Sequence, residues 1–565
     1  MKYCLFIAAL ACIFLSSNAS SQVFSTKNRY TRADTLRGTI TTYRQGWDVL
    51  KYDLTVQVDI DNKSIVGSNR ITYNETLPVR TMQIDLQAPM QIDSIVTESG
   101  NKVFFRKTDG TWLVALKPEG AMIKFLPGIR SLVVYFSGIP KEAKNAPWDG
   151  GLIWKKDAMG NPFIATACQG LGASIWWPCK DHQSDEPNNG MTIKLVVPDG
   201  LAALSNGRLL HKKDTLNNYT AWTWEVKNPI NNYGVTMNIG RYVNWTDTLM
   251  GEQGKLDLSY WVLDYNIDTA KKQFAQVKPM LRSFEHWFGQ YPFYEDGYKL
   301  IETPFLGMEH QSAVAYGNKF RNGYLGRDLS GTGWGLKWDF IIIHESGHEW
   351  FGNNITTNDI ADMWVHEGFT NYSETLYTET QFGREAAYEY VFGIRKNIRN
   401  DKPIIGDYGV NSEGSGDMYY KSANMIHSIR NAMNDDVQFR KMTRGLNATY
   451  FNKTVDGSMV EAYISKESGM DLSKVFDQYL RTIQIPVLEF YMDKNNKSVQ
   501  YRYTNCVKGF NLPLVIKSGA NNMKVYPTDK WQKTKLRVDQ QDLWQADLVE
   551  KNFYINVKKV QGKTR

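Results

Sequence analysis

The distribution of hydrophobic and polar residues divides the chain into three stretches. Over residues 47–243, apolar positions recur mostly at every second residue, and polar turn clusters separate the runs. The clearest run places apolar side chains at alternate positions: Leu50, Tyr52, Leu54, Val56 and Val58. A period of two is typical of strands that bury one face, so this stretch predicts a β-rich domain.

The period changes near residue 265, where a mainly helical stretch begins that continues to about residue 480. Apolar positions spaced like helical turns are clearest in the segments 269–288, 334–352 and 418–433. A zone of short strands at 298–316 interrupts this stretch. Strand-like runs return at 486–559 and favour a terminal β-sandwich; they cover 487–492, 499–503, 514–517, 523–526 and 553–557.

These patterns predict an α+β protein of several domains. We expect a signal peptide at 1–21, an N-terminal all-β domain at 22–243, a mixed α/β domain at 244–484 and a small C-terminal β-sandwich at 485–565. The sequence contains no internal repeat and no low-complexity tract.

The composition is that of an ordinary globular protein, with 42% hydrophobic and 22% charged residues among 565. It excludes a wholly disordered chain, a collagen-like fibre and a disulfide-dense mini-protein. The net charge of +7 comes from interspersed signs, and no basic run is interleaved with aromatic residues. We therefore expect no nucleic acid among the partners.

The first residues have the three parts of a cleaved secretory signal. Lys2 gives a positive start, residues 4–15 form a 12-residue apolar stretch, and small residues follow at 16–19. This stretch is shorter than the roughly 20 residues of a membrane span, and no later segment qualifies as a span. We expect an exported protein, periplasmic or secreted, whose mature chain begins near residues 20–22. A lipoprotein anchored through Cys12 is less favoured, because the apolar stretch continues beyond that cysteine.

Three cysteines remain after removal of this signal: Cys168, Cys179 and Cys506. In an oxidising compartment Cys168 and Cys179 are able to close a loop, and the odd number leaves one thiol free. The sequence does not fix the distance between their alpha carbons, so a bridge and two free thiols both remain open.

The most informative segment is His344-Glu345-Ser346-Gly347-His348. Two histidines four residues apart lie on one face of a helix, close enough to share a metal ion. Neutral imidazole is a strong ligand of Zn²⁺, and Glu345 is placed to act as general base toward a water molecule. A solvated helix with chance histidines is the alternative interpretation of this motif alone.

A candidate for the third ligand lies further along the chain. Eighteen residues separate His348 from Glu367, which is followed by Gly368 and Phe369. A glutamate at this point can return on a second helix and complete a set of two histidines and one carboxylate. Such a set leaves a fourth position open, which is typical of catalytic zinc. We therefore expect one catalytic Zn²⁺ per chain, held by His344, His348 and Glu367.

This combination resembles the gluzincin metallopeptidases, and the flanking residues resemble the M1, alanyl aminopeptidase-like family among them. The residues that carry the likeness to M1 are Glu349-Trp350 after the motif and Gly307-Met308-Glu309-His310 before it. The resemblance covers about 47–559. It implies a saddle-like N-terminal β domain, a thermolysin-like catalytic domain and a small β-sandwich. Many members carry a large helical domain after the β-sandwich, and we expect this protein to be a short form without it.

Two stretches match the family's contacts to the substrate. Glu309 matches its amine-binding glutamate and follows Gly307 and Met308, in a stretch that looks like an edge strand for the substrate backbone. Gln169 matches a position that also contacts the amino end of the substrate. Carboxylates suit this task because a buried ammonium group must be paired. Taken alone, Glu309 would be interpreted as a surface carboxylate, and the alternative for Gln169 is a capping or loop amide. In this family the residue at His310 is usually asparagine, so contacts just beyond the amine pocket are expected to differ.

The resemblance also implies a tyrosine that stabilises the oxyanion. Tyr419 and Tyr420 stand where that tyrosine is expected, with Ser422 in place of a glycine. The register favours Tyr419 as the donor and leaves Tyr420 as the alternative. Glu374, seven residues after Glu367 on the same helix face, either holds the outer N–H of a metal-bound histidine or is a surface acid.

Residues and resemblance together predict a zinc aminopeptidase that acts on peptides with a free N-terminus. Zinc and Glu345 activate water, Tyr419 and zinc hold the oxyanion, and Glu309 and Gln169 anchor the α-ammonium group. A thermolysin-like endopeptidase would use the same motif without Glu309, and a non-catalytic binding module is a further alternative. Glu349 is a candidate for the amine site or for a contact to a ligand. The preferred first residue and the oligomeric state do not follow from the sequence.

Overall fold

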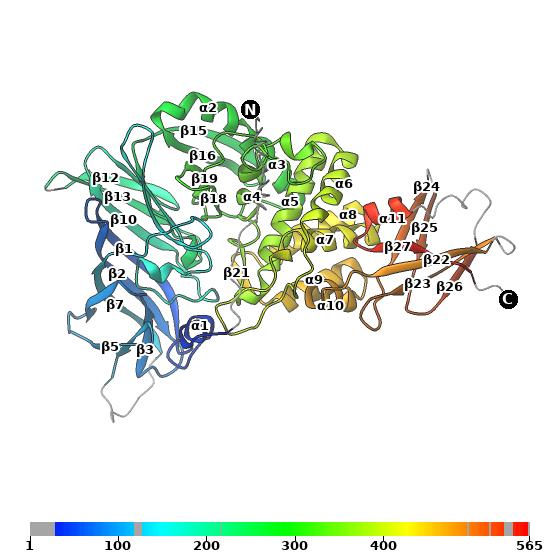
Figure 1. Ribbon diagram of the computed structural model, residues 1–565. Helices are drawn as coiled ribbons and strands as arrows, with labels where there is room; N and C mark the ends of the chain where they lie inside the picture. Colours follow the sequence, from blue (N-terminus) through cyan, green and yellow to red (C-terminus); the bar gives the residue numbers. More distant parts are fainter. Residues whose placement is uncertain are drawn as a thin grey trace, which may run out of the picture.

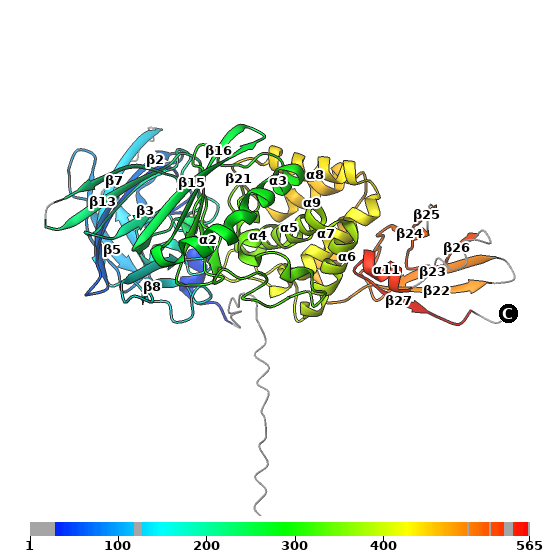
Figure 2. The same cartoon turned by 90° about the horizontal axis from the view of Figure 1, so that it is seen from above.

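The computed structural model describes residues 29–117, 127–215, 217–493, 497–518, 521–535 and 546–562. The predicted signal at 1–21 lies outside these residues. Figure 1 shows a β-rich N-terminal region in blue and cyan, a mainly helical centre in green and yellow, and a small β region in orange and red. Seen from above, the three follow one another along the long axis of the molecule (Figure 2). The α+β architecture agrees with the prediction from the sequence.

A seven-stranded sheet forms the largest layer of the N-terminal region. Its strands in spatial order are β12 (Arg208–Asp214), β13 (Tyr219–Val226), β10 (Met191–Pro198), β1 (Trp47–Asp59), β2 (Ser64–Glu75), β7 (Gly128–Gly138) and β4 (Gln91–Thr97). β1 runs antiparallel to β2 over its whole length and parallel to β10. Side chains alternate between buried and partly exposed from Tyr52 onward, as the period of two predicts.

One position in β1 departs from the predicted alternation. The register with β2 shifts between Val49 and Lys51, so Val49 is fully buried and Leu50 is only half-buried. A bulge inserts one extra residue and reverses the faces on either side of it. The alternation in the sequence predicts that Leu50 lies on the same face as Tyr52, because no residue type marks the bulge.

Two smaller sheets and one helix complete this region. The sheets are β11 (Ala202–Leu204), β14 (Asn238–Gly240), β9 (Pro162–Ala167), β8 (Gly151–Lys156), and β3 (Thr81–Asp85), β6 (Thr111–Ala115), β5 (Phe104–Thr108). The helix, α1 (Arg32–Gly38), was not predicted; it begins with a capping box between Thr31 and Asp34. The region is therefore β-rich, with a helix that a period of two does not reveal. Cys168 and Cys179 are buried here as free thiols, not a bridge.

The central region begins with a five-stranded sheet. Its order is β15 (Tyr242–Gly251), β16 (Gly254–Leu263), β17 (Tyr298–Glu302), β19 (Val314–Tyr316) and β18 (Gly307–Met308). β18 pairs with β19 on one side, and among the described residues no strand lies on its other side. The strand zone expected at 298–316 is therefore present, and its edge is β18.

Helices make up the rest of the centre. They are α2 (Ile267–Gln273), α3 (Val277–Phe288), α4 (Phe340–Gly347), α5 (Trp364–Phe382), α6 (Arg384–Gly393), α7 (Tyr420–Met433), α8 (Asp436–Thr449), α9 (Gly457–Ser468) and α10 (Ser473–Arg481). A two-stranded ladder of β20 (Ile355–Thr357) and β21 (Lys453–Val455) links them. The segment expected as one helix at 334–352 forms a helix over α4 alone, after a short 3₁₀ turn at Trp334–Leu336.

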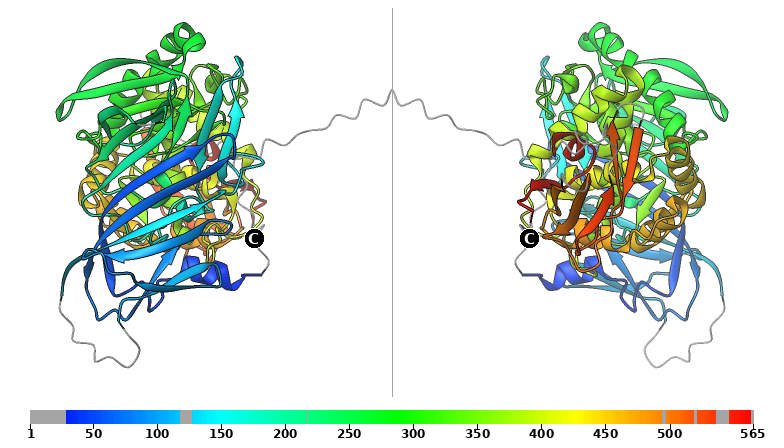
Figure 3. Two further views of the ribbon diagram at one scale, coloured as in Figure 1. Left: turned by 90° about the vertical axis from the view of Figure 1, so that its left-hand side faces the viewer. Right: turned by 90° about the vertical axis from the view of Figure 1, so that its right-hand side faces the viewer.

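The C-terminal region contains two sheets and helix α11 (Ala546–Asn552). The sheets are β26 (Gln532–Lys535), β23 (Ser498–Thr504), β22 (Val487–Asp493), β27 (Asn556–Lys559), and β24 (Leu514–Ser518), β25 (Asn521–Val525). Figure 3 shows this end of the molecule in its right panel and the N-terminal sheets in its left panel. One hydrophobic core joins the C-terminal strands to the central helices. In the described ranges no helix combines the length and the apolar character that a membrane crossing requires.

Candidate metal and amine site

Helix α4 contains His344, and His348 is the C-cap residue directly after its last turn. Asp339 caps the helix, because its Oδ1 accepts hydrogen bonds from the backbone N–H of Ile341 and Ile342 at 3.1 and 3.3 Å. The apolar residues between cap and motif are buried and fix the helix in the core. His344 and His348 therefore lie one turn apart, with ring centroids separated by 5.0 Å.

Glu367 reaches the histidines from the first turn of α5. Glycines allow the close approach of the helices. A Cβ atom on Gly347 would lie 2.6 Å from Oγ of Ser373 in α5, and one on Gly368 would lie 2.6 Å from Cβ of Ser422 in α7. Any larger side chain at these two positions would push the helices apart. Gly347 thus allows the approach of α5, which carries Glu367, to the histidine pair, and Gly368 allows the approach of α7 to α5.

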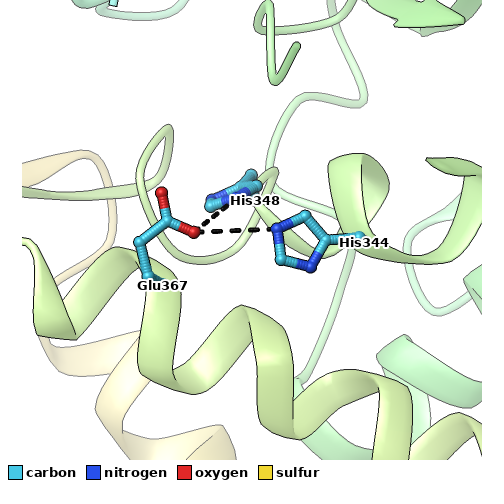
Figure 4. A group of neighbouring side chains, drawn as sticks. All are labelled: His344, His348 and Glu367. Carbon is cyan, nitrogen blue, oxygen red and sulfur yellow. Dashed lines mark ion pairs between the residues drawn. The ribbon is translucent and has the colours of Figure 1, made fainter. Parts of the chain in front are cut away.

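The three candidate ligands face one another (Figure 4). Nε2 of His344 and Nε2 of His348 lie 3.6 and 3.4 Å from Oε2 of Glu367. Zinc at ~2.0–2.1 Å from each of two tetrahedral ligands separates their donor atoms by about 3.3–3.4 Å. Neither oxygen of Glu367 has a hydrogen-bond partner among the described residues, although the side chain is 1% exposed. The donor types and their spacing therefore fit Zn²⁺.

Hydrogen bonds on the far side of each imidazole hold the ring in place. Nδ1 of His344 lies 2.7 Å from Oε1 of Glu374, and Nδ1 of His348 lies 2.9 Å from the carbonyl oxygen of Phe351. With the proton on Nδ1, the lone pair of each Nε2 points toward Glu367. The structure thus decides between the two interpretations of Glu374: it is a buried partner of a ligand, not a surface acid. Tyr390 also donates a hydrogen bond to it, at 2.5 Å.

Glu345 lies beside the ligands and against strand β18. Its Oε1 would be 2.7 Å from a Cβ atom on Gly307, so only glycine fits there without moving the carboxylate. Its Oε2 has no hydrogen-bond partner among the described residues. Donor atoms of Glu345, Glu309 and His348 lie within 4.8 Å of one another. Burial raises the pKa of Glu345, which favours proton uptake by this group.

Glu309 follows Met308 and is held by two groups from the N-terminal region. Nε2 of Gln169 donates to its Oε1 at 2.5 Å, and the hydroxyl group of Tyr233 donates to the same oxygen at 3.2 Å. Oε2 has no partner within the described chain, and the side chain is 1% exposed. One oxygen is therefore fixed while the other is left to accept a hydrogen bond from a ligand. No sequence pattern pointed to Tyr233, which lies in a 3₁₀ turn 64 residues from Gln169 and 76 residues from Glu309.

Glu349 differs from Glu309, because both of its carboxylate oxygens accept hydrogen bonds within the protein. Its Oε2 accepts a hydrogen bond from the hydroxyl group of Tyr291 at 3.0 Å, and its Oε1 accepts one from the backbone N–H of Ser312 at 2.9 Å. Glu349 thereby holds the turn that follows Glu309. The side chain of His310 in this turn is fully buried, and its ring centroid lies 6.5 Å from that of Phe305.

Tyr419 lies next to His344, one of the candidate metal ligands. Its ring is nearly parallel to that of His344, with 6.0 Å between centroids and 27° between planes. It precedes the first residue of α7 and is 4% exposed. Burial and the negative charge of Glu367 raise the pKa of Tyr419 well above its usual value. The phenol therefore keeps its proton and remains a hydrogen-bond donor.

Comparisons with known proteins find similar chains among peptidases. Residues 274–479 match the model of the peptidase family M1 domain. The chain is 22% identical to human glutamyl aminopeptidase over 480 residues, which are 79% of this chain and 47% of the relative. It is 26% identical to human aminopeptidase B over 251 residues, 44% of this chain and 35% of the relative. The chain thus spans about half or less of these relatives.

Solved structures share the fold. The M1 zinc metallopeptidase of Deinococcus radiodurans superposes with a TM-score of 0.64 at 19% identity and covers 79% of this chain and 96% of that chain. A point mutant of that metallopeptidase, solved with a Tyr-Ser-Ala substrate, superposes with a TM-score of 0.62 at 19% identity and covers 78% of this chain and 95% of that chain.

Proposed function

We propose that this protein, whose residues 274–479 match the peptidase family M1 domain, is a zinc-dependent aminopeptidase, a hydrolase that releases the N-terminal residue of peptides. The observation that carries this proposal is the free oxygen of Glu309 beside the set of two histidines and one glutamate. An endopeptidase needs the metal ligands and a general base. It does not need a buried, unpaired carboxylate to bind the ammonium group of a free N-terminus.

His344, His348 and Glu367 would hold the zinc ion, since their donor atoms converge and their outer contacts fix each ring. When bound, zinc supplies a Lewis acid that polarises a peptide carbonyl and lowers the pKa of water. Side chains of this protein transfer the proton, stabilise the oxyanion and bind the amino end of the substrate.

Glu345 acts as the general base and then as the general acid. It takes a proton from the attacking water through its unpartnered Oε2 and passes that proton to the nitrogen of the leaving amine. The hydroxyl group of Tyr419 donates a hydrogen bond to the carbonyl oxygen as negative charge develops on it. Both groups are buried at 4% exposure, where hydrogen bonds to a developing charge are stronger than in bulk water.

Glu309 and Gln169 bind the free amino end of the peptide. An α-ammonium group at Oε2 of Glu309 pairs the buried carboxylate. The side-chain amide oxygen Oε1 of Gln169 has no partner among the described residues and can accept a second ammonium hydrogen. Because a bond already fixes Gln169 to Glu309, the two acceptors are oriented before the substrate arrives. The bound amino end places the first peptide bond beside Glu345.

Matched peptides with free and acetylated N-termini test the proposal. The purified protein with zinc should release the first residue of the free peptide, should leave the acetylated peptide intact, and should lose activity with a chelator. Cleavage of the acetylated peptide would identify an endopeptidase instead. Failure to cleave either peptide, with zinc bound, would indicate a binding module.

We also propose that the protein is exported. The support is the leader pattern at residues 1–21, with its positive start, 12-residue apolar stretch and small-residue exit. Expression of the full sequence, fractionation of the cells and determination of the N-terminus of the mature chain test this. A mature start near residues 20–22 is expected, and an intact Met1 on cytoplasmic protein would contradict it.

A further inference from the structure

Glu413 is a buried carboxylate that the proposed mechanism does not use. Its side chain is 6% exposed, and neither carboxylate oxygen has a hydrogen-bond partner among the described residues. An ionised carboxylate buried without a partner is costly, so most such groups are paired with a donor or a cation. Like Oε2 of Glu309, the two carboxylate oxygens of Glu413 are therefore free to bind a positively charged ligand.

Backbone contacts fix the position of Glu413. The backbone N–H of Ser412 donates to the carbonyl oxygen of Val410 at 2.8 Å, and that of Ser415 donates to the carbonyl oxygen of Pro403 at 3.0 Å. On Gly414, a Cβ atom would overlap the carbonyl group of Ile404. The carboxylate is thus presented by a packed segment.

The same loop joins Glu413 to the amine site. The amide Nδ2 of Asn411 donates a hydrogen bond to the carbonyl oxygen of Gly170 at 3.0 Å, and Gly170 directly follows Gln169. On its other side, the loop leads to Tyr419 six residues later. Glu413 thus lies on the segment between a residue that binds the amino end and one that faces the carbonyl oxygen.

Electrostatic interactions agree with this position. Burial raises the pKa of Glu413 well above its usual value, and the charges of Glu367 and Glu309 raise it further. Glu413 in turn raises the pKa of Tyr419. The charge of Lys402 has the opposite effect on Glu413 but does not reverse the shift. A ligand that brings a positive charge would offset the repulsion among these carboxylates.

We propose that Glu413 selects a basic side chain, arginine or lysine, as the first residue of the substrate. The proposal rests on the aminopeptidase function proposed above. With the α-ammonium group at Glu309 and the carbonyl oxygen at Tyr419, the first side chain extends from an α-carbon held between these groups. A guanidinium group can donate two parallel hydrogen bonds to the two free oxygens of Glu413, and an ammonium group can pair with one of them.

Aminoacyl substrates with arginine, lysine, methionine or leucine as the first residue test the proposal. Methionine and leucine are the uncharged comparison of similar bulk. The zinc-loaded wild type should show a kcat/KM for arginine at least about tenfold above that for methionine, and Glu413→Gln should reduce that ratio by at least about tenfold. Glu413→Asp, which keeps the charge, should recover part of the ratio. A ratio unchanged by Glu413→Gln would overturn the proposal.

Asp407→Asn is the matched control. Asp407 is in the same loop and is exposed, and its carboxylate accepts a hydrogen bond from Tyr30 at 2.5 Å. This variant removes one negative charge from the loop and should leave the arginine-to-methionine ratio unchanged. An equal loss of the ratio in Asp407→Asn would show that the effect is one of general charge.

A binding measurement separates recognition from turnover. Free L-arginine should inhibit the wild type at least about tenfold more strongly than its uncharged analogue L-citrulline, and Glu413→Gln should abolish this difference. Equal inhibition of the wild type by the two amino acids would contradict the proposal. If the zinc-loaded wild type hydrolyses only substrates with uncharged first residues, the aminopeptidase function holds and the role of Glu413 fails. If it hydrolyses none of the substrates, the proposed function itself fails.

Discussion

Nδ1 of His344 lies 2.7 Å from Oε1 of Glu374, so a carboxylate on one helix orients a metal ligand on another. The same carboxylate accepts hydrogen bonds from Asn371 and Tyr390 at 2.8 and 2.5 Å. These contacts hold Glu374 in place when no metal is bound. The lone pair of His344 is therefore directed toward Glu367 before zinc arrives.

Replacement of Glu374 by glutamine should weaken zinc binding by about 10–100-fold, because the imidazole of His344 loses a charged partner. Competition with a chromogenic chelator measures the affinity directly. Glu379→Gln is the control, since Glu379 lies on the same helix but pairs with Arg430 at 2.6 Å. An equal loss of zinc affinity in both variants would assign the effect to the helix and not to the contact with His344.

Glu345→Gln should retain zinc and lose turnover by about 10²–10⁴-fold, because the amide cannot take a proton from water. The three ligands are untouched by this change. Zinc content by elemental analysis and kcat on one aminoacyl substrate provide the measurement. A variant with near-normal kcat would show that another group acts as the base.

Gly307→Ala should lower kcat by about tenfold or more while zinc content stays unchanged. The new Cβ atom would lie 2.7 Å from Oε1 of Glu345 and 2.9 Å from Cγ2 of Ile341, so the general base must move. Gly416→Ala is the matched control, because a Cβ atom there meets no atom within 4 Å. Unchanged kcat in Gly307→Ala would mean that the strand yields without disturbing Glu345.

Tyr419→Phe should lower kcat by about 10²–10³-fold with a smaller effect on KM, because a donor to the developing oxyanion is removed. Tyr420→Phe is the comparison, since Tyr420 is its neighbour in sequence and its ring lies 6.4 Å from that of Tyr419. Steady-state kinetics of both variants decide between the two tyrosines. Loss of turnover in Tyr420→Phe alone would reverse the assignment.

Glu302→Gln should change how stability depends on pH. Burial raises the pKa of Glu302 from 4.5 to about 7 in the folded protein. Between these values the folded protein binds a proton that the unfolded chain has released, so the free energy of unfolding falls as pH rises, by up to about 3 kcal/mol. Glutamine does not titrate and escapes this loss.

The melting temperature of Glu302→Gln relative to the wild type should therefore rise from pH 5 to pH 8. Any cost of replacing the bonds to Leu263 and Asn266, at 2.8 and 2.7 Å, is present at both pH values and cancels in this comparison. A difference in melting temperature that is equal at pH 5 and pH 8 would show that Glu302 keeps an ordinary pKa.

The sequence contains most of the metal site because its parts are local. His344 and His348 are one helical turn apart, so a single helix brings them together whatever surrounds it. Glu345 comes with them, and the strand alternation of β1 from Tyr52 onward likewise needs only neighbouring residues. Glu367 is more distant in the sequence. Its role could still be predicted, because a second helix that begins a fixed number of residues after His348 is enough to bring Glu367 back to the histidines.

Other features depend on contacts between distant segments and left no periodic signal. The bulge at Leu50 is fixed by pairing with β2. Helix α1 has a local capping box of Thr31 and Asp34, but with seven residues it is too short to show a helical period. Cys168 and Cys179 have spacing compatible with a bridge, yet the fold buries both as free thiols.

The sequence alone therefore determined which side chains can bind a metal and activate water, since that chemistry resides in residue types at helical spacing. Tertiary structure decided which residues come together in the proposed binding sites for the amino end and the first side chain of a substrate. Tyr233 and Gln169 come from the N-terminal region and meet Glu309 from the central region, and Glu413 lies on a loop held against Gly170. Burial deprives these oxygens of water, and only the packing of separate segments creates that burial.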